Sequence, residues 1–388
     1  MKTFANLLYP YSIEKFFAEN WTQRGVLIPG EKPDRFDSFF SWQQLNDLLN
    51  FHQLQHPSIR FSIKGQRLPA CDPKHWIKYC QQGATLVIDH VHDRVPVLTD
   101  WVWALQEEIG QNTAHLNLYC SWPGLQGFKN HFDTHEVFIL QIDGTKEWFV
   151  FDETMKYPVR KDNGPEHRPP ESPPYIHEVL QPGDVLYIPR GHWHYAVAQD
   201  TPSLHLTLGI CCLTGGNMLD WLIGELKEEE AWRQNLPLMP DGNIEPLERS
   251  VQSLLERLKA SLDRDRLALQ YSLRHATSNP RAPEISLPGQ LGFGVFERGM
   301  ETRFRHTKFQ TLKLEPLPES GYQILTNGKK ITFKGTNPEL VDNLLDNLLN
   351  CEAFTVGDAA QWLPDFDLET QILPILSGLV KEGMILVD

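Results

Sequence analysis

The segment from residue 131 to residue 151 constrains the fold of this chain more than any other. Residues 136–142 are rich in Val, Ile, Leu and Phe, Asp143-Gly144 follows, and a second apolar run occupies residues 146–151. Two such runs joined by Asp-Gly are typical of a β-hairpin, and the first run indicates a buried strand. The sequence therefore predicts a buried hairpin within a domain rich in β-strands.

Two side chains that can bind a metal stand directly before this hairpin. His131 and Asp133 are two residues apart, and such residues project to the same face of an extended chain. One imidazole and one carboxylate supply two of the three ligands of the 2-His-1-carboxylate site of non-haem Fe(II) oxygenases. The third ligand is expected on a later strand that folds back, after the turns within residues 181–191. His192 and His194 both follow and share a face, so periodicity leaves the choice open.

These motifs resemble the JmjC-type Fe(II)/2-oxoglutarate oxygenases, and most of all the ribosomal oxygenase branch of that family. The similarity extends over most of the chain and is most specific in its middle third. Five spaced segments carry it: Asn117-Leu-Tyr119, His131-Phe-Asp133, residues 138–146, residues 186–194 and residues 203–207.

The resemblance implies a role for individual residues. It makes His131, Asp133 and His194 the metal ligands, because in that family the imidazole three residues after the Arg-Gly turn binds iron. It leaves His192 and His135 as candidates for supporting positions beside those ligands. The basic anchor for the distal carboxylate of 2-oxoglutarate falls on Lys146, and the positions that line the co-substrate pocket fall on Asn117, Tyr119 and Thr207.

The chain also departs from the family pattern. Thr134 and His135 stand where acidic and aromatic residues are usual, and Gly209 replaces a hydroxyl residue at the edge of the pocket. One contact with the co-substrate is therefore in question. His90 and His92 also alternate near the end of a predicted strand, but no carboxylate pair accompanies them, so we expect ordinary strand-end histidines.

The resemblance implies an enzyme that uses Fe(II), 2-oxoglutarate and O2 to hydroxylate a protein side chain, namely Arg or His of a ribosomal protein. Other interpretations are a hydroxylase of a non-ribosomal protein or peptide, a methyl-lysine demethylase, and a cupin metalloprotein of different chemistry. A cupin of other chemistry would not need Lys146, Asn117 and Tyr119 together. A structural zinc site would need four ligands, and His135 or His192 could supply the fourth.

The order of the elements predicts an α+β chain of three parts. Residues 1–215 are expected to form a double-stranded β-helix (jelly-roll or cupin) with N-terminal helices. Residues 216–290 are predicted to be helical, mainly over 217–234 and 245–276, and the resemblance implies a dimerisation module there. Packing of these helices on the chain's own barrel is the alternative.

Residues 291–388 complete the predicted architecture. They contain a predicted hairpin around Asn327-Gly328 and an order of strand, helix, helix and strand that resembles a winged helix. Acidic residues lie near the candidate recognition helix, so phosphate binding would be opposed there. We expect a structural role or a protein contact for this domain.

Composition limits the cellular setting. The 388 residues carry a formal net charge of −14, so a global positive field for nucleic acid is excluded. The six cysteines form no C-x-x-C pair, and scattered thiols fit a reducing cytoplasm. No apolar run is long enough for a membrane span, and the N-terminus lacks the apolar core of a signal peptide. The polar, Pro-rich residues 152–174 predict either a rim loop over the site or a disordered insertion.

Overall fold

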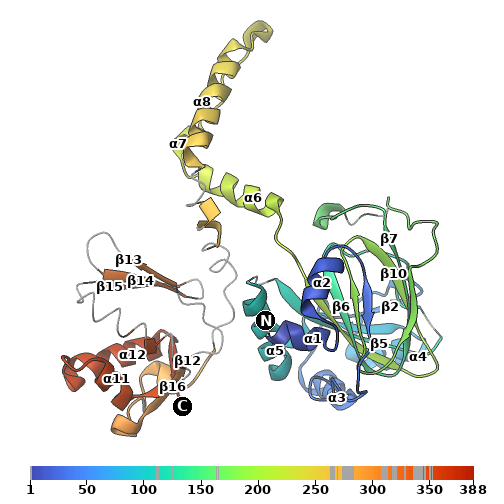
Figure 1. Cartoon of the computed structure of the whole chain (residues 1–388), viewed down its shortest axis with the longest axis horizontal. Coiled ribbons are helices and arrows are strands. Elements are labelled where there is room, and N and C mark those ends of the chain that lie inside the picture. The colour runs from blue at the N-terminus through green and yellow to red at the C-terminus, as the bar shows by residue number, and fades with distance from the viewer. Residues whose placement is uncertain are drawn as a thin grey trace. The chain divides into compact units, whose positions relative to one another are not determined.

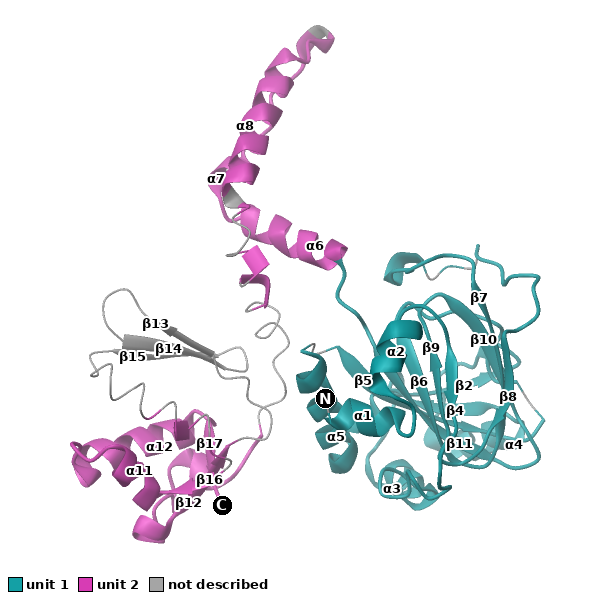
Figure 2. Ribbon diagram, viewed as in Figure 1, with its two compact units in different colours: residues 1–214 teal, residues 215–388 magenta. Residues whose placement is uncertain are grey.

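A computed structural model describes most of the chain. It covers residues 2–110, 113–124, 126–162, 164, 166–262, 267–268, 270–272, 284–306, 313–316, 321–326, 329–334, 344, 347–348, 351 and 353–388. For residues 241, 261, 313–316, 321–326 and 329–334 it describes the backbone alone. The chain divides into two compact units, residues 1–214 and 215–388, which Figure 2 colours separately.

The first unit is built from two antiparallel sheets that form a double-stranded β-helix, as the sequence predicted (Figure 1). The larger sheet has the order β1 (Val26–Ile28), β9 (Val185–Ile188), β6 (Glu136–Asp143), β11 (Ser203–Ile210), β5 (Ala114–Ser121), β4 (Thr85–Ile88), β2 (Ile59–Ile63) and β3 (Gln66–Arg67). The smaller sheet has the order β10 (His192–Ala198), β7 (Lys146–Glu153) and β8 (Ile176–Leu180).

The predicted hairpin between β6 and β7 is wrong, although both strands are present. β6 pairs with β11 and β9 in the larger sheet, whereas β7 pairs with β10 and β8 in the smaller one. The turn at Gly144, which has a φ of +64°, therefore carries the chain from one sheet to the other. An Asp-Gly turn reverses the chain locally, but the partners of the strands are chosen by distant segments.

Strand β6 separates the core from the interior of the barrel. Phe138 and Leu140 belong to a cluster with the N-terminal helices, while Val137 and Ile139 pack with residues of the smaller sheet. This alternation explains why the strand is apolar at consecutive positions. The surrounding helices are α1 (Lys2–Leu8), α2 (Ile13–Glu19), α3 (Trp42–Phe51), α4 (Trp76–Gln81) and α5 (Pro96–Ile109).

The second unit begins with helices whose apolar residues are partly exposed. They are α6 (Gly215–Leu226), α7 (Glu230–Arg233) and α8 (Glu245–Ser261). The predicted continuation of α8 to residue 276 falls largely outside the described residues. Leu219, Ile223, Val251 and Leu255 are more than 40% exposed. A surface of this kind lacks a partner within the described part of its own unit.

The rest of the second unit contains two small sheets and further helices. One sheet has the order β16 (Ala353–Thr355), β12 (Arg303–His306) and β17 (Ile385–Val387), and the other joins β13 (Lys313–Pro316), β14 (Gly321–Thr326) and β15 (Lys329–Lys334). The pairing of β14 with β15 confirms the hairpin predicted around residues 327–328, which are themselves not described. The helices are α11 (Val356–Trp362) and α12 (Leu373–Lys381), which follows a π-helical turn over Leu368–Ile372.

Two expectations about this unit stay predictions. Residues 335–350, which would contain the first helix of the expected strand, helix, helix and strand order, are largely outside the described residues, so the winged-helix interpretation is untested. The separation of residues 216–290 as a domain of their own is likewise untested. Among the helices that the structure describes, none has both the length and the apolar character needed to cross a membrane.

Candidate metal centre

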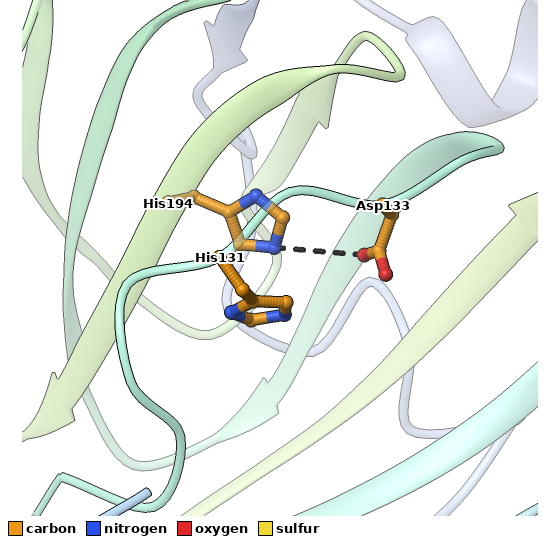
Figure 3. A group of neighbouring side chains, drawn as sticks. All are labelled: His131, Asp133 and His194. Carbon is orange, nitrogen blue, oxygen red and sulfur yellow. Dashed lines mark ion pairs between the residues drawn. The ribbon is translucent and has the colours of Figure 1, made fainter. Parts of the chain in front are cut away.

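Two segments that are far apart in sequence place three candidate ligands together. His131 and Asp133 precede β6, and His194 lies on β10. The amide of His131 donates to the carbonyl of His194 at 3.1 Å, and the amide of His194 donates to the carbonyl of His131 at 2.7 Å. This pair of backbone bonds fixes the spacing of the two imidazoles. One ligand atom from each residue lies within 4.8 Å of the others (Figure 3).

The two imidazoles are oriented so that their Nε2 atoms can bind a metal. Nδ1 of His131 lies 2.8 Å from the carbonyl oxygen of Lys129, and Nδ1 of His194 lies 3.1 Å from that of His192. A carbonyl oxygen only accepts, so each Nδ1 carries the proton and each Nε2 keeps its lone pair. Nε2 of His194 lies 3.6 Å from Asp133 Oδ2, which marks where a shared cation would lie.

The charges of these residues also suit a metal. Burial by itself raises the pKa of Asp133, but the imidazoles of His135 and His131 outweigh it and bring the pKa down to about 2. Burial and the neighbouring His131 lower the pKa of His194 to about 4. At neutral pH the site therefore holds one carboxylate and a neutral His194, which are the protonation states that metal binding requires.

His192 is held away from this centre despite its position two residues before His194. Its Nδ1 is 2.8 Å from the hydroxyl of Tyr175, and its Nε2 is 3.4 Å from Glu153 Oε2. An irregularity in the pairing of β10 with β7 falls between the two histidines, so they do not project alike. Within the described residues, the cluster thus has three ligands, an open set that differs from a closed structural zinc site.

A cavity of about 240 Å³ extends from the three ligands into the barrel. It includes three of the residues that the sequence assigned to the co-substrate: Lys146, Tyr119 and Thr207. The walls are largely aromatic, with Trp148 and His205 among them. The centre is therefore a metal-ligand set at one end of a pocket large enough for a small organic acid.

Comparison with known proteins agrees with this arrangement. Residues 90–218 match the JmjC domain family. Ribosomal oxygenase 1 of Rattus norvegicus is 30% identical over 264 residues, covering 61% of this chain and 42% of that protein. The bifunctional lysine-specific demethylase and histidyl-hydroxylase NO66 of Drosophila sechellia is 29% identical over 220 residues, covering 53% of this chain and 33% of that protein.

The chain contains a JmjC domain.

The resemblance to ribosomal oxygenases that the motifs indicated is confirmed by these relatives, although the chain spans less than half of their length. A solved structure has the same fold over nearly the whole chain. It is the Escherichia coli ribosomal oxygenase YcfD in complex with cobalt and 2-oxoglutarate, with a TM-score of 0.60, 18% identity, and coverage of 98% of this chain and 99% of that one.

Lys146 lines the same cavity, and it pairs with Ala198 at the other end of β10 from His194. Its Nζ donates to Ser121 Oγ at 2.9 Å, and burial lowers the pKa of this lysine to about 7. No carboxylate pairs with it among the residues that the structure describes. Because a buried ammonium without a counter-charge is unfavourable, the site is suited to an anion. Two further polar atoms in the cavity wall, Trp148 Nε1 and His205 Nδ1, also lack a partner within the described chain.

Arg60 is a cavity residue that the sequence did not single out. It lies on β2 and makes a bidentate pair with Asp89, with Nε to Oδ2 at 2.7 Å and an η-nitrogen to Oδ1 at 2.9 Å. Residues 58–64 alternate as a strand does, but nothing local links this strand to the site. Ser121 was missed for the same reason, whereas His205 lies within residues 203–207, a segment that carries the resemblance, but was given no role. His205 stacks on Tyr119 with ring centroids 5.0 Å apart, and burial keeps its pKa well below the usual value.

Asn117 is placed differently from the other predicted pocket residues. It shares the inner face of β5 with Tyr119, but it lines a neighbouring depression of about 450 Å³ together with Asp89 and His90. Its side-chain oxygen accepts a hydrogen bond from the amide of His90 at 3.0 Å. His90 and His92 are not part of the described metal-ligand cluster. Asn117 therefore borders the centre without facing the same cavity.

Proposed function

We propose that this chain is an Fe(II)- and 2-oxoglutarate-dependent dioxygenase that hydroxylates a protein side chain. The observation that carries the proposal is one cavity with an open 2-His-1-carboxylate set at one end and an unpaired buried lysine at the other. The first feature suits Fe(II) with free coordination positions. The second suits a dicarboxylate whose far end would reach Lys146.

Residues at one end of the cavity would bind the metal, and residues at the other end would bind the co-substrate. His131, Asp133 and His194 would hold Fe(II), which when bound supplies the redox chemistry that couples 2-oxoglutarate decarboxylation to oxygen insertion. Lys146 would bind the distal carboxylate, with Ser121 holding the ammonium in place. Tyr119 and Thr207 would contact the co-substrate, and Trp148 and His205 would exclude water around it.

The proposed substrate is an Arg or His side chain of a ribosomal protein. The names of the relatives, ribosomal oxygenase 1 and histidyl-hydroxylase NO66, support this choice. The net charge of −14 also favours association with a basic protein. A hydroxylase of another protein is the second candidate. Demethylation of methyl-lysine is a further candidate because it is named for NO66.

We also propose that the chain acts as a cytoplasmic homodimer. The exposed apolar residues of α6 and α8 support an association through this helical segment, since such surfaces are unusual on monomers. Light scattering coupled to size exclusion tests the dimer directly. A monomer at micromolar concentration would contradict it, and replacing Leu219 and Ile223 with Glu is expected to convert a dimer to a monomer.

The oxygenase proposal is tested by iron-dependent conversion of 2-oxoglutarate to succinate. Purified protein is assayed with and without a ribosomal protein extract, beside His131→Ala and Lys146→Ala. Exposed residues of the same types provide matched controls, His177→Ala and Lys78→Ala. We expect no turnover for His131→Ala, a much higher requirement for 2-oxoglutarate for Lys146→Ala, and wild-type behaviour for both controls.

A protein that binds one metal ion per chain but oxidises no 2-oxoglutarate with any extract would contradict the proposal. A metal-binding cupin of other chemistry would then be the better interpretation. If turnover is found, a mass increase of one oxygen on a ribosomal protein identifies the substrate. A loss of methyl groups from lysine would instead favour the demethylase.

A further inference from the structure

Two histidines, His115 of β5 and His135 two residues after Asp133, lie near the metal ligands but are not part of the cavity lining. Gly209 of β11 pairs with His115 of β5 on one side and with Val137 of β6 on the other. Val137 and Thr207 line the metal cavity, and Thr207 is two residues before Gly209 on the same strand. Ser121, which holds Lys146, is at the far end of β5. His115 therefore lies at the other end of the same face of β5, because alternate residues of a strand share a face.

Gly209 provides the space that a pair of imidazole rings occupies. A Cβ at this position would come within 2.5 Å of His115 Cε1 and within 2.8 Å of His135 Cδ2. The backbone of Gly209 is not among those with a positive φ, so its conformation does not demand glycine. The packing of the two rings, whose centroids are 5.4 Å apart, explains why glycine is present.

The nitrogens of these rings are available to a ligand. Neither His115 nor His135 is fully buried, and no hydrogen bond joins either ring to another residue within the described ranges. Burial, with a contribution from His135, lowers the pKa of His115 to about 4, so this ring is uncharged at neutral pH. Both imidazoles also lie close enough to Asp133 to oppose the effect of burial on the pKa of its carboxyl.

We propose that His115 and His135, seated on Gly209, contact the protein side chain that is oxidised and determine which side chain reaches the metal. This inference rests on the proposed oxygenase function. The pair suits a planar side chain that carries N–H groups, an imidazole or a guanidinium. Such a group donates to an imidazole nitrogen and stacks on the ring. An aliphatic side chain would leave those nitrogens unpaired.

The experiment separates contact with the substrate from the rest of the reaction. His115→Phe and His135→Phe keep an aromatic ring and remove its nitrogens. His177→Phe is the matched control, because His177 stacks on Phe149 at a ring distance of 4.2 Å on β8, away from this face. A peptide containing the residue that the wild-type protein oxidises is the substrate. Its binding is also measured by fluorescence anisotropy with cobalt in place of iron.

We expect the two variants to bind one metal ion per chain. Peptide affinity and the ratio of hydroxylated product to succinate should both fall by about tenfold, the effect of losing one or two hydrogen bonds to a bound ligand. The control should change neither quantity. Peptides with His, Arg or Leu at the target position identify which planar group is preferred.

Unchanged peptide affinity and unchanged product ratio in both variants would overturn the inference while leaving the oxygenase intact. Equal acceptance of the Leu peptide would overturn it as well. If the wild-type protein forms no succinate, the proposed function is wrong, and the inference that rests on it is wrong as well. Loss of metal from a variant would show that the ring supports the metal site, which also contradicts a role in substrate contact.

Discussion

Two places in the barrel, Lys146 on one side and His115 with His135 on the other, differ in charge and in exposure. Lys146 lines the cavity, is almost fully buried and donates to Ser121, and no carboxylate pairs with it in the described chain. His115 and His135 are partly exposed beside Gly209, outside the lining of that cavity, and offer ring nitrogens without a hydrogen-bond partner in the described chain. Under the two proposals, the charged position binds a small anion, and the imidazole pair selects a planar side chain by hydrogen bonding and stacking.

The largest expected effect comes from removing the charge of Lys146. Lys146→Met keeps most of the side-chain length and should weaken 2-oxoglutarate binding by about 100-fold, because the buried carboxylate loses its partner. Peptide affinity should stay unchanged. Isothermal titration with cobalt-loaded protein measures both values, and equal losses for the two ligands would abolish the distinction between the two places.

The pH dependence of co-substrate binding is the next largest effect. Burial lowers the pKa of Lys146 to about 7. Below pH 7 the side chain is already an ammonium, whereas above pH 7 the neutral amine must gain a proton before it can pair with a carboxylate. The Michaelis constant for 2-oxoglutarate should therefore be flat below pH 7 and rise by up to about tenfold per pH unit above it. In Lys146→Met this rise should disappear. A flat wild-type profile between pH 6.5 and 8.5 would show that the lysine stays charged.

Substitution beside the imidazole pair should give the reverse pattern. Gly209→Ala places a Cβ 2.5 Å from His115 Cε1, so the rings must shift. We expect the Michaelis constant for the protein substrate to rise by about tenfold, while that for 2-oxoglutarate changes by less than twofold. His115→Ala removes the closer of the two collisions and leaves the one with His135, so the double variant should lose less than the sum of the two single variants. Steady-state kinetics of the four proteins tests this non-additivity.

The smallest effect is expected at His192, which belongs to neither place. Its ring is held by Tyr175 and Glu153, so His192→Gln should keep one metal ion per chain and near-normal turnover. Loss of these buried contacts should lower the free energy of unfolding by about 1–3 kcal/mol. Metal analysis and urea denaturation measure the two quantities. A variant without metal would make His192 a fourth ligand and support a closed site.

Much of the site could be predicted from the sequence because its ligands are close together in the chain or follow a recognisable turn. His131 and Asp133 share one short segment, and His194 follows the Arg-Gly turn of the family that the chain resembles. Arg60 and His205 could not be found in this way. Each looks like an ordinary strand residue until β2 and β11 are folded beside β5.

Two turns with the same local chemistry show where the limit lies. Asn327-Gly328 and Asp143-Gly144 both predicted hairpins, yet only β14 and β15 pair with each other, while β6 and β7 enter different sheets. The sequence by itself determined the apolar strands, the turns and the candidate pair His131 and Asp133, because these depend on neighbouring residues, whereas His194 was named by the resemblance. Only the tertiary structure decided strand partners, the position of His192 and the imidazole pair over Gly209, because these depend on which distant surfaces are buried together.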